Sequence, residues 1–550
     1  MATTEQGPSA DTQRLHELGY AQELDRKMGT FSNFAISFSI ISILAGAITT
    51  FFLGLNAGGP RVIMIGWIVV GAMALAVGAS MGEICSTYPT AGGLYYWSAK
   101  LAKKNGAFWS FFTGWFNLIG QIGVIASVDF ALATMTVFFL NTFTDSIVPT
   151  NKWHVFATYL IVLTLHGILN TFNVSLVKLL GDVSVWWHVV GVAVIFAILF
   201  IAPNSDKTEG IGFIFKGANR TGWTGGAGMT VYVSLLGLLL AQYTITGFDA
   251  SAHVSEETHG AAVGAPKAIV RSIYISAIAA FVLNLAMLAA FPKGALGHLG
   301  PNLATSGTSA YDGIAANGIN AGSALFMTIG KNLGRTLIFI SIVGQFFCGM
   351  ASVTANSRMI YAFSRDGGLP GSKLWHSINK KTRTPTNSVW LGVVLSALIG
   401  AISLVQVGGN AVAFFALTGI AVVGLYIAYV IPVFLKIRKD DFEAGPWNLG
   451  KWSRPIGWLS VAWVGFVTIL FFAPVYWPFW PIGGNTKNAD GSVAFYNINN
   501  VNFTAPIIIG SVILLGLYWM VSARKWFTGP KIQGTPEELA AIEHDLSQFD

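Results

Sequence analysis

The chain has 550 residues, of which 53% are hydrophobic and 10% are charged, and its mean hydropathy is +0.60. A typical soluble domain carries about 25% charged residues, so the composition excludes an ordinary water-soluble enzyme and predicts a polytopic helical membrane protein. The net charge of +7 does not indicate nucleic-acid binding, because membrane proteins concentrate Lys and Arg on their cytoplasmic side.

Twelve apolar runs follow a polar N-terminal tail at residues 1–30, and each is long enough to cross a bilayer. The first run is too long for the apolar segment of a cleavable signal peptide, so it is expected to act as a signal anchor. We expect spans at 31–55, 62–85, 107–139, 155–175, 183–202, 230–256, 272–291, 321–357, 388–407, 411–434, 457–477 and 505–522.

The orientation follows from the positive charges. Most of the 32 Lys and Arg residues lie in the alternate segments that share a side with both termini, and the positive-inside rule places that side in the cytoplasm. We therefore expect a multi-pass protein of the plasma membrane with both termini cytoplasmic, and the short loops favour a bacterial inner membrane. The C-terminal tail, 523–550, contains Thr535-Pro-Glu-Glu538, which predicts a short capped surface helix.

The sixth run is interrupted near its midpoint by Tyr243, Thr246, Gly247 and Asp249. A carboxylate near the bilayer centre costs about 2.5–3.5 kcal/mol on insertion scales, so it normally faces a partner or a transport path. Backbone that leaves a helix within lipid is tolerated only where protein buries it or where it lines a cavity. We interpret the segment as a broken helix at a transport site; the alternative is a glycine kink with Asp249 satisfied by neighbouring donors.

The first run has its own weak point at Ala45-Gly46-Ala47. Small residues at mid-span indicate either close helix packing or an unwound bend that exposes backbone N–H groups. Spans one and six occupy matching places in two five-helix halves, and paired broken helices mark the binding site of inverted-repeat transporters. We therefore hypothesise that a substrate carboxylate binds at Ala45, Gly46, Ala47 and Ile48, because free amides favour anions.

Three blocks, SIISILAGAITTFFLGLNAGGP, TGFDASAHVSEETHGAAVGAPKAIVRS and ANSRMIYAFSRDGGLP, resemble the amino acid/choline transporter family of the amino acid–polyamine–organocation superfamily. The resemblance covers about residues 15–525. It implies an all-α fold of twelve transmembrane helices with broken helices 1 and 6. It also implies a ten-helix core at 31–434, made of inverted repeats 31–202 and 230–434, with two further helices at 435–522.

The resemblance also implies roles for single residues. Ala45-Gly46-Ala47 matches a bend that holds the substrate carboxylate, although Ala in place of the first Gly narrows the allowed backbone angles. Gln121 matches a polar position that faces the substrate, and its alternative is an interhelical hydrogen bond. The sixth-span positions that match the family's substrate path are Tyr243, Ile245, Thr246, Gly247, Phe248 and Asp249.

Four further residues are candidates for proton coupling or gating. His188 stands where proton-coupled relatives often carry a membrane-embedded Lys, and histidine titrates near physiological pH; the alternative is a hydrogen-bonded core residue. Asp129 follows Gln121 by eight residues on the third span and is expected on the same helix face, where it attracts an ammonium group or accepts hydrogen bonds. Glu83 and Glu256 are expected to pair with cytoplasmic Lys or Arg and to control inner gating, with Arg358 and Arg365 as candidate partners.

We therefore expect a secondary active permease that imports a small amino acid, GABA or a neutral amino acid, by proton-coupled alternating access. The alternatives are a choline, amine or polyamine permease and an amino acid exchanger. No metal site or cofactor is expected; H⁺ is the expected coupling ion, with Na⁺ near Ser352 and Thr354 as the alternative. The expected partners are the small-molecule substrate and membrane lipid, with no nucleic acid, and a monomer or weak homodimer. The sequence contains no nucleophile–base set and no phosphate-binding loop that would indicate an enzyme.

Overall fold

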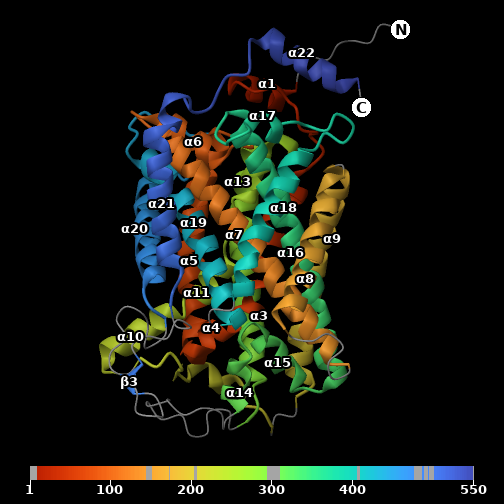
Figure 1. Cartoon of the computed structure of the whole chain (residues 1–550), viewed down its shortest axis with the longest axis vertical. Helices are drawn as coiled ribbons and strands as arrows, with labels where there is room; N and C mark the ends of the chain where they lie inside the picture. Colours follow the sequence, from red (N-terminus) through yellow and green to blue (C-terminus); the bar gives the residue numbers. More distant parts are fainter. Residues whose placement is uncertain are drawn as a thin grey trace.

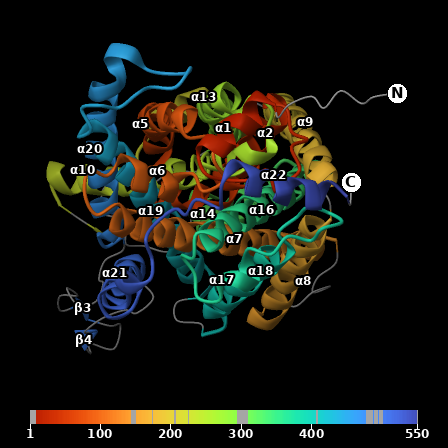
Figure 2. The same cartoon turned by 90° about the horizontal axis from the view of Figure 1, so that it is seen from above.

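The computed structural model describes residues 9–143, 151–172, 174–203, 207–223, 225–293, 310–405, 409–475, 486–487, 493–494 and 501–548. Most of its helices run roughly parallel to one long axis and form a bundle (Figure 1). The first and last helices, α1 and α22, lie together at one end of this bundle, here called the terminal end, and α14 and α15 lie at the opposite end (Figure 1). Figure 2 shows α1 and α22 lying across the terminal end.

The long helices are α2 (Thr30–Ile40), α5 (Gly59–Thr87), α7 (Gly106–Asn141), α8 (Lys152–Thr171), α9 (Val174–Ile201), α10 (Ala227–Leu236), α13 (Ala261–Ala289), α16 (Lys331–Arg365), α18 (Thr386–Gly400), α19 (Gly409–Ile437), α20 (Ser453–Phe472), α21 (Thr504–Val521) and α22 (Pro536–Ser547). The short helices are α1 (Ala10–Glu17), α3 (Gly46–Thr49), α4 (Phe51–Asn56), α6 (Leu94–Leu101), α11 (Leu239–Thr244), α12 (Ala250–His253), α14 (Ala310–Ala316), α15 (Ala321–Met327) and α17 (Ser372–Trp375), with 3-10 turns η2 (Ile211–Phe215), η3 (Ser255–Glu257), η4 (Gly318–Asn320), η5 (Ala401–Val405), η6 (Gly450–Trp452) and η8 (Ala523–Lys525).

Two antiparallel two-stranded pairs complete the described elements. β1 (Ala57–Gly58) pairs with β2 (Ala218–Asn219), and β3 (Thr486–Lys487) pairs with β4 (Val493–Ala494). The first pair joins the end of α4 to the segment that precedes α10, and so ties the two interrupted spans together at the end opposite α1 and α22.

Eleven helical segments among the described residues are long and apolar enough to span a membrane, which supports a polytopic membrane protein. The sequence predicts twelve spans. The two numbers differ because the first predicted span, 31–55, is divided into α2, α3 and α4, none of which reaches membrane length by itself.

Other boundaries also differ from the prediction. The eighth run, 321–357, is two helices, α15 and α16, separated at Gly330, whose φ of 130° suits glycine. α9 and α13 begin earlier than expected, because the polar residues at their starts continue the helix. Parts of the predicted spans 155–175, 388–407 and 457–477, and of the tails 1–30 and 523–550, fall outside the described residues.

The two interruptions lie side by side in the bundle. A Cβ on Gly46 of α3 would lie 2.6 Å from Oγ1 of Thr244 at the end of α11, and the Ser37 hydroxyl of α2 donates to the Phe248 carbonyl at 2.9 Å. The sixth span unwinds between α11 and α12, where Gly247 has a φ of 87°, as the sequence predicts. The first span unwinds over Ile41–Ala45, slightly before the predicted Ala45-Gly46-Ala47.

Candidate functional site

A small cavity lies where the two interrupted spans meet α7 and α16. Its volume of about 20 Å³ has room for about one water molecule, so a larger ligand enters only when helices move apart. We call it the α3 cavity; its lining residues are Ile40, Ser42, Ala45, Gly46, Thr49, Val124, Val128, Tyr243, Thr244, Thr246, Gln345 and Cys348.

The break in the first span leaves backbone donors beside this cavity. The N–H of Gly46 donates to the Ser42 carbonyl at 2.8 Å, and the N–H of Thr49 donates to the Ala45 carbonyl at 3.0 Å. Ala47 and Ile48 lie between Gly46 and Thr49 in the chain, and their N–H groups have no acceptor within the described residues. Buried backbone donors are rarely left unpaired. Ala47 and Ile48 themselves line neither described cavity, although their neighbours Gly46 and Thr49 line the α3 cavity.

The hydroxyl groups of the cavity wall present oxygen lone pairs. Thr49, Thr244 and Thr246 donate their hydroxyl protons to the backbone carbonyls four residues earlier, at 2.8, 2.9 and 2.6 Å. A hydroxyl that has donated its proton can still accept hydrogen bonds. None of the described residues that line the α3 cavity is Asp or Glu, so its wall combines neutral acceptors with nearby free N–H donors.

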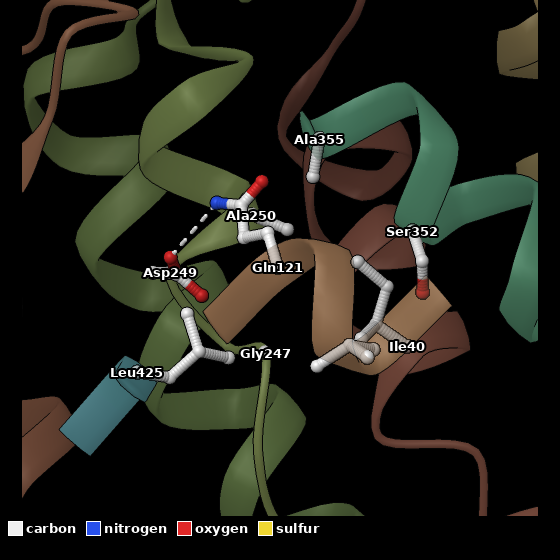
Figure 3. Close-up of a pocket in the computed structure, with 9 residues that line it drawn as sticks. Ile40, Gln121, Gly247, Asp249, Ala250, Ser352, Ala355 and Leu425 are labelled. Carbon is white, nitrogen blue, oxygen red and sulfur yellow. Dashed lines mark hydrogen bonds between the residues drawn. The ribbon is translucent and has the colours of Figure 1, made fainter. Parts of the chain in front are cut away.

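A second cavity of about 10 Å³, the Asp249 cavity, lies next to the first and shares Ile40 and Val124 with it. In Figure 3, Gln121 and Asp249 are joined by a hydrogen bond, and Ser352 and Ala355 lie on the neighbouring α16. Gln121 and Gly247, both predicted site residues, also line this cavity.

The Asp249 carboxylate is a fully buried junction between several helices. It accepts hydrogen bonds from the Tyr429 hydroxyl at 2.6 Å, from Asn117 at 3.0 Å and from Gln121 at 3.3 Å, and it contacts His253 at 3.2 Å. Tyr429 also accepts the N–H of Gly247 at 3.2 Å. With these partners Asp249 holds the unwound segment against α7 and α19, as the kink interpretation of the sequence expects, while it also lines a cavity.

The remaining sixth-span candidates divide into two groups. Tyr243 and Thr246 line the α3 cavity, and the Tyr243 hydroxyl donates to Ser127 at 2.8 Å. Ile245 and Phe248 line neither cavity: the Ile245 carbonyl accepts from Tyr426 at 2.8 Å. The Phe248 ring packs against the ring of Tyr429, with 4.8 Å between their centroids.

Asp129 does not share the orientation of Gln121. It lines neither cavity, and its carboxylate lies 3.1 Å from Nδ1 of His166 on α8, with both side chains fully buried. The predicted shared face is wrong because eight residues at about 3.6 residues per turn leave a rotation of roughly 80° between the two side chains. The Asp129–His166 pair therefore joins α7 to α8 away from the cavities.

His188 connects α9 to the break in the first span. Its Nδ1 donates to the Ser184 carbonyl at 2.8 Å, and its Nε2 lies 2.6 Å from the Ser42 hydroxyl. The Ser42 oxygen also accepts the N–H of Ala45 at 3.1 Å. Because a hydroxyl can either donate or accept, Ser42 can pair with His188 in the neutral or the protonated form.

Buried ion pairs close the terminal end of the bundle. Glu256 pairs with Arg365 through contacts of 2.9 and 3.1 Å, and Glu257 pairs with Arg358 at 2.9 Å. The sequence names both arginines as candidate partners, and the structure assigns one to each glutamate. Glu83 pairs with Lys436 of α19 and accepts from the Ser453 hydroxyl at 2.6 Å, so it fastens α5 to α19 and to the start of α20.

The two tails cover this closed end. Asp366, directly after α16, accepts hydrogen bonds from Tyr20 at 2.9 Å, from Tyr95 at 2.8 Å and from the N–H of Lys531 at 3.0 Å. Burial raises the pKa of the Asp366 carboxyl, against the opposing influence of Arg365 and these hydrogen bonds. Gln533 of the C-terminal tail accepts the N–H of Ala21 at 2.7 Å. The tails are thus packed onto the bundle, and Thr535 with Glu538 forms the predicted capping box of α22.

The two residues considered for sodium have different neighbours. Ser352 lines the Asp249 cavity, whereas the Thr354 hydroxyl donates to Asn170 of α8 at 2.6 Å. Among the described residues, no group of three or more His, Cys, Asp or Glu side chains could hold a metal ion.

Several residues of this network are missing from the sequence prediction, namely Asn117, His166, Gln345, Tyr429 and Lys436. Asn117, His166, Gln345 and Tyr429 stand within apolar runs, and Lys436 begins the basic stretch KIRK at the end of one. The chain around each residue does not indicate its role, because that role depends on a partner from a distant helix.

Comparisons with known proteins agree with this architecture. The family model described as "Amino acid permease" matches residues 28–513. The chain is 38% identical over 534 residues to the "Amino-acid permease BAT1" of Arabidopsis thaliana, covering 94% of this chain and 95% of the relative. It is 39% identical over 541 residues to the "Amino-acid permease BAT1 homolog" of Oryza sativa subsp. japonica, covering 96% and 97%. It is also 29% identical over 562 residues to a "Putative polyamine transporter" of Candida albicans, covering 98% and 92%.

These relatives come from plants and a fungus. They therefore count against the bacterial inner membrane that the short loops favour. The prediction of a multi-pass membrane protein is supported.

The closed terminal end predicts that breaking the Glu256–Arg365 pair exposes the α3 cavity. Cys348 lines that cavity and is buried, so in a Cys85→Ala background it reports access by its rate of maleimide labelling. Removing one partner of a buried ion pair costs about 3–5 kcal/mol, so Arg365→Ala should speed labelling about tenfold or more. Arg454→Ala, which breaks an exposed pair with Asp440, is the matched control and should leave the rate unchanged. Equal rates in a folded Arg365→Ala protein and the unaltered protein would show that this pair does not close the path.

Proposed function

The chain belongs to the amino acid permease family, and on that premise we propose that it carries a neutral amino acid through the membrane by alternating access. The observation that carries this proposal is the composition of the α3 cavity. Neutral oxygen acceptors line this cavity at the meeting point of two interrupted spans. The N–H groups without an acceptor belong to Ala47 and Ile48, which lie in the chain between its lining residues Gly46 and Thr49.

The free donors suit a carboxylate. The N–H groups of Ala47 and Ile48 have no acceptor within the described residues, and hydrogen bonds from backbone N–H to a carboxylate are about twice as strong as those between neutral groups. In this proposal the carboxylate of the amino acid accepts from these two groups. The residues of the predicted carboxylate site, Ala45 to Ile48, thus act through their backbone.

The neutral acceptors suit a primary ammonium group. An ammonium group carries three N–H donors, and the oxygens of Thr49, Thr244 and Thr246 have lone pairs left after their own donations. A zwitterion is neutral as a whole, so it needs no carboxylate from the protein to balance its charge. This agrees with a lining without Asp or Glu among the described residues.

The same lining argues against choline. A quaternary ammonium has no N–H donor and is recognised by a cage of aromatic faces. Tyr243 is the one aromatic residue among the described lining of the α3 cavity. The Phe248 ring lines neither described cavity and packs against Tyr429.

A polyamine is the second candidate, because one relative is described as a putative polyamine transporter. A polyamine carries several positive charges and calls for carboxylates along its path. Asp249 lines the neighbouring cavity, but Tyr429, Asn117 and Gln121 already donate to its oxygens. We therefore favour a neutral amino acid over a polyamine as the substrate. GABA, which has the same two charged groups at a greater separation, is a further test substrate.

His188 is the proposed proton site. It is fully buried. Its Nε2 contacts the Ser42 hydroxyl, and the oxygen of that hydroxyl accepts the N–H of Ala45 in the break of the first span. Protonation makes both ring nitrogens donors, which forces Ser42 to turn its proton elsewhere and changes the contacts of the break. This is a direct path from proton binding to the substrate site, and it favours symport with H⁺.

In this proposal α2, α3 and α4 together form a further crossing, which gives twelve. Residues 31–202 and 230–434 form the two inverted repeats, and the terminal end faces the cytoplasm. The excess of Lys and Arg in the segments on the side of both termini supports that orientation.

Uptake of radiolabelled substrates into proteoliposomes tests the function. We expect a neutral amino acid such as alanine to accumulate and unlabelled alanine, but not choline, to compete. Gly46→Leu should reduce uptake about tenfold or more, because its side chain would press on Thr244 and overpack the break. Gly510→Leu, at a glycine with open space around it, is the matched control. Uptake of choline or a polyamine with no uptake of amino acids would refute the proposal.

A second prediction concerns coupling. His188→Ala should abolish accumulation driven by an inward proton gradient, because no group is left beside Ser42 to take up the proton, and it should preserve exchange of internal for external substrate. The comparison is His154→Ala, which removes an exposed histidine on α8. Gradient-driven accumulation that persists in a folded His188→Ala protein would rule out this residue as the coupling site.

A further inference from the structure

Gln345 of α16 is a buried side chain with one end unpaired. Its Nε2 donates to the Val128 carbonyl of α7 at 3.0 Å, and the side chain lines the α3 cavity. Its Oε1 is buried and has no partner among the described residues. The contact with Val128 fixes the orientation of the amide, because only the nitrogen of the amide can donate to a carbonyl.

The unpaired Oε1 sets Gln345 apart from the other described residues that line the α3 cavity. Of the described residues that line the α3 cavity, Gln345 alone has a buried polar side-chain atom without a partner. The hydroxyls of Thr49, Thr244 and Thr246 are each engaged with a backbone carbonyl. An unsatisfied buried acceptor is costly and calls for an explanation, and an acceptor in a cavity wall can pair with a donor on a molecule that enters the cavity.

Gln345 belongs to a different wall from the free N–H groups. The helix that carries Ala47 and Ile48, α3, packs against α4, α11 and α15, whereas the Gln345 side chain of α16 reaches the Val128 carbonyl of α7; α15 contacts both α3 and α16. A substrate whose carboxylate is held at α3 therefore directs another part of itself toward α16. The acceptor on α16 is placed to recognise that other part.

We propose that Gln345 determines the side-chain selectivity of transport. Its Oε1 accepts a hydrogen bond from an N–H or O–H group that the transported neutral amino acid carries beyond its α-carbon. This inference rests on the proposed function and names the substrate class within it: amino acids with a hydroxyl or amide side chain. A site built to hydrogen-bond a substrate group discriminates strongly against an analogue that lacks the group, because the buried partner is then left unpaired.

Two matched substrate pairs test the proposal, serine with alanine and glutamine with methionine, in proteoliposome uptake and in ligand-dependent thermal shifts of the purified protein. In the unaltered protein we expect the donor-bearing member of each pair to have at least about tenfold higher kcat/KM. Gln345→Met keeps the length of the side chain and removes the acceptor. It should remove the preference, lowering uptake of serine and glutamine while alanine and methionine change little.

A second variant and a control make the result specific. Gln345→Glu places a negative charge at the same position and should bring uptake of lysine and thermal stabilisation by lysine, neither of which we expect in the unaltered protein. Ser341→Ala removes a polar group one turn earlier on α16, where the hydroxyl donates to the Leu337 carbonyl and lies outside the cavity lining; it should leave all four substrates unchanged.

The outcomes separate the two proposals. An equal fall for all four substrates in Gln345→Met assigns Gln345 to the ammonium group or to packing and overturns the inference, as does an unchanged preference. Neither result counts against the proposed function, because the unaltered protein still transports amino acids in both cases. If the unaltered protein neither transports nor is stabilised by any of the four amino acids, the proposed function fails and this inference falls with it.

Discussion

The structure depends on one constraint, that a backbone polar group within lipid must find a partner. Two spans nevertheless come apart at mid-length, and the protein supplies partners for several of the backbone groups that this releases. Tyr429 accepts the N–H of Gly247, Tyr426 donates to the Ile245 carbonyl, and Ser37 donates to the Phe248 carbonyl. The N–H groups of Ala47 and Ile48 at the start of α3 are among those that have no acceptor within the described residues, and the carboxylate site is proposed there.

The two ends of the molecule are closed by different means. At the terminal end, buried ion pairs join α16 to η3 and α19 to α5, and the packed tails cover them. At the other end, β1 and β2 join the two interrupted spans, and the Tyr311 hydroxyl donates to the Leu55 carbonyl. The cavities between these ends hold about one water each. The described conformation is thus closed around the site, and alternating access requires the contacts at each end to break in turn.

Much of the architecture can be predicted from the sequence, because a hydropathic run and a residue that interrupts it are both local features. The break at Gly247 is found correctly, since the polar residues around it interrupt the apolar run and glycine tolerates the φ of 87° that the unwound backbone adopts. The break in the first span is found but placed a few residues late, because Ser42 and not Gly46 accepts the hydrogen bonds that turn the chain. The partner of each buried polar side chain is harder to predict from the sequence. Which arginine pairs with Glu256, or that His166 faces Asp129, depends on the rotation of whole helices, and an error of 80° moves a side chain from a cavity to a helix interface.

The most direct test of the central claim is a structure determined with alanine bound. The account predicts α2 and α3 separated at Ile41–Ala45, with the carboxylate oxygens at about 2.7–3.2 Å from the backbone nitrogens of Ala47 and Ile48. A continuous helix through residues 30–56, or a carboxylate bound by side chains elsewhere while these two N–H groups stay free, would contradict it.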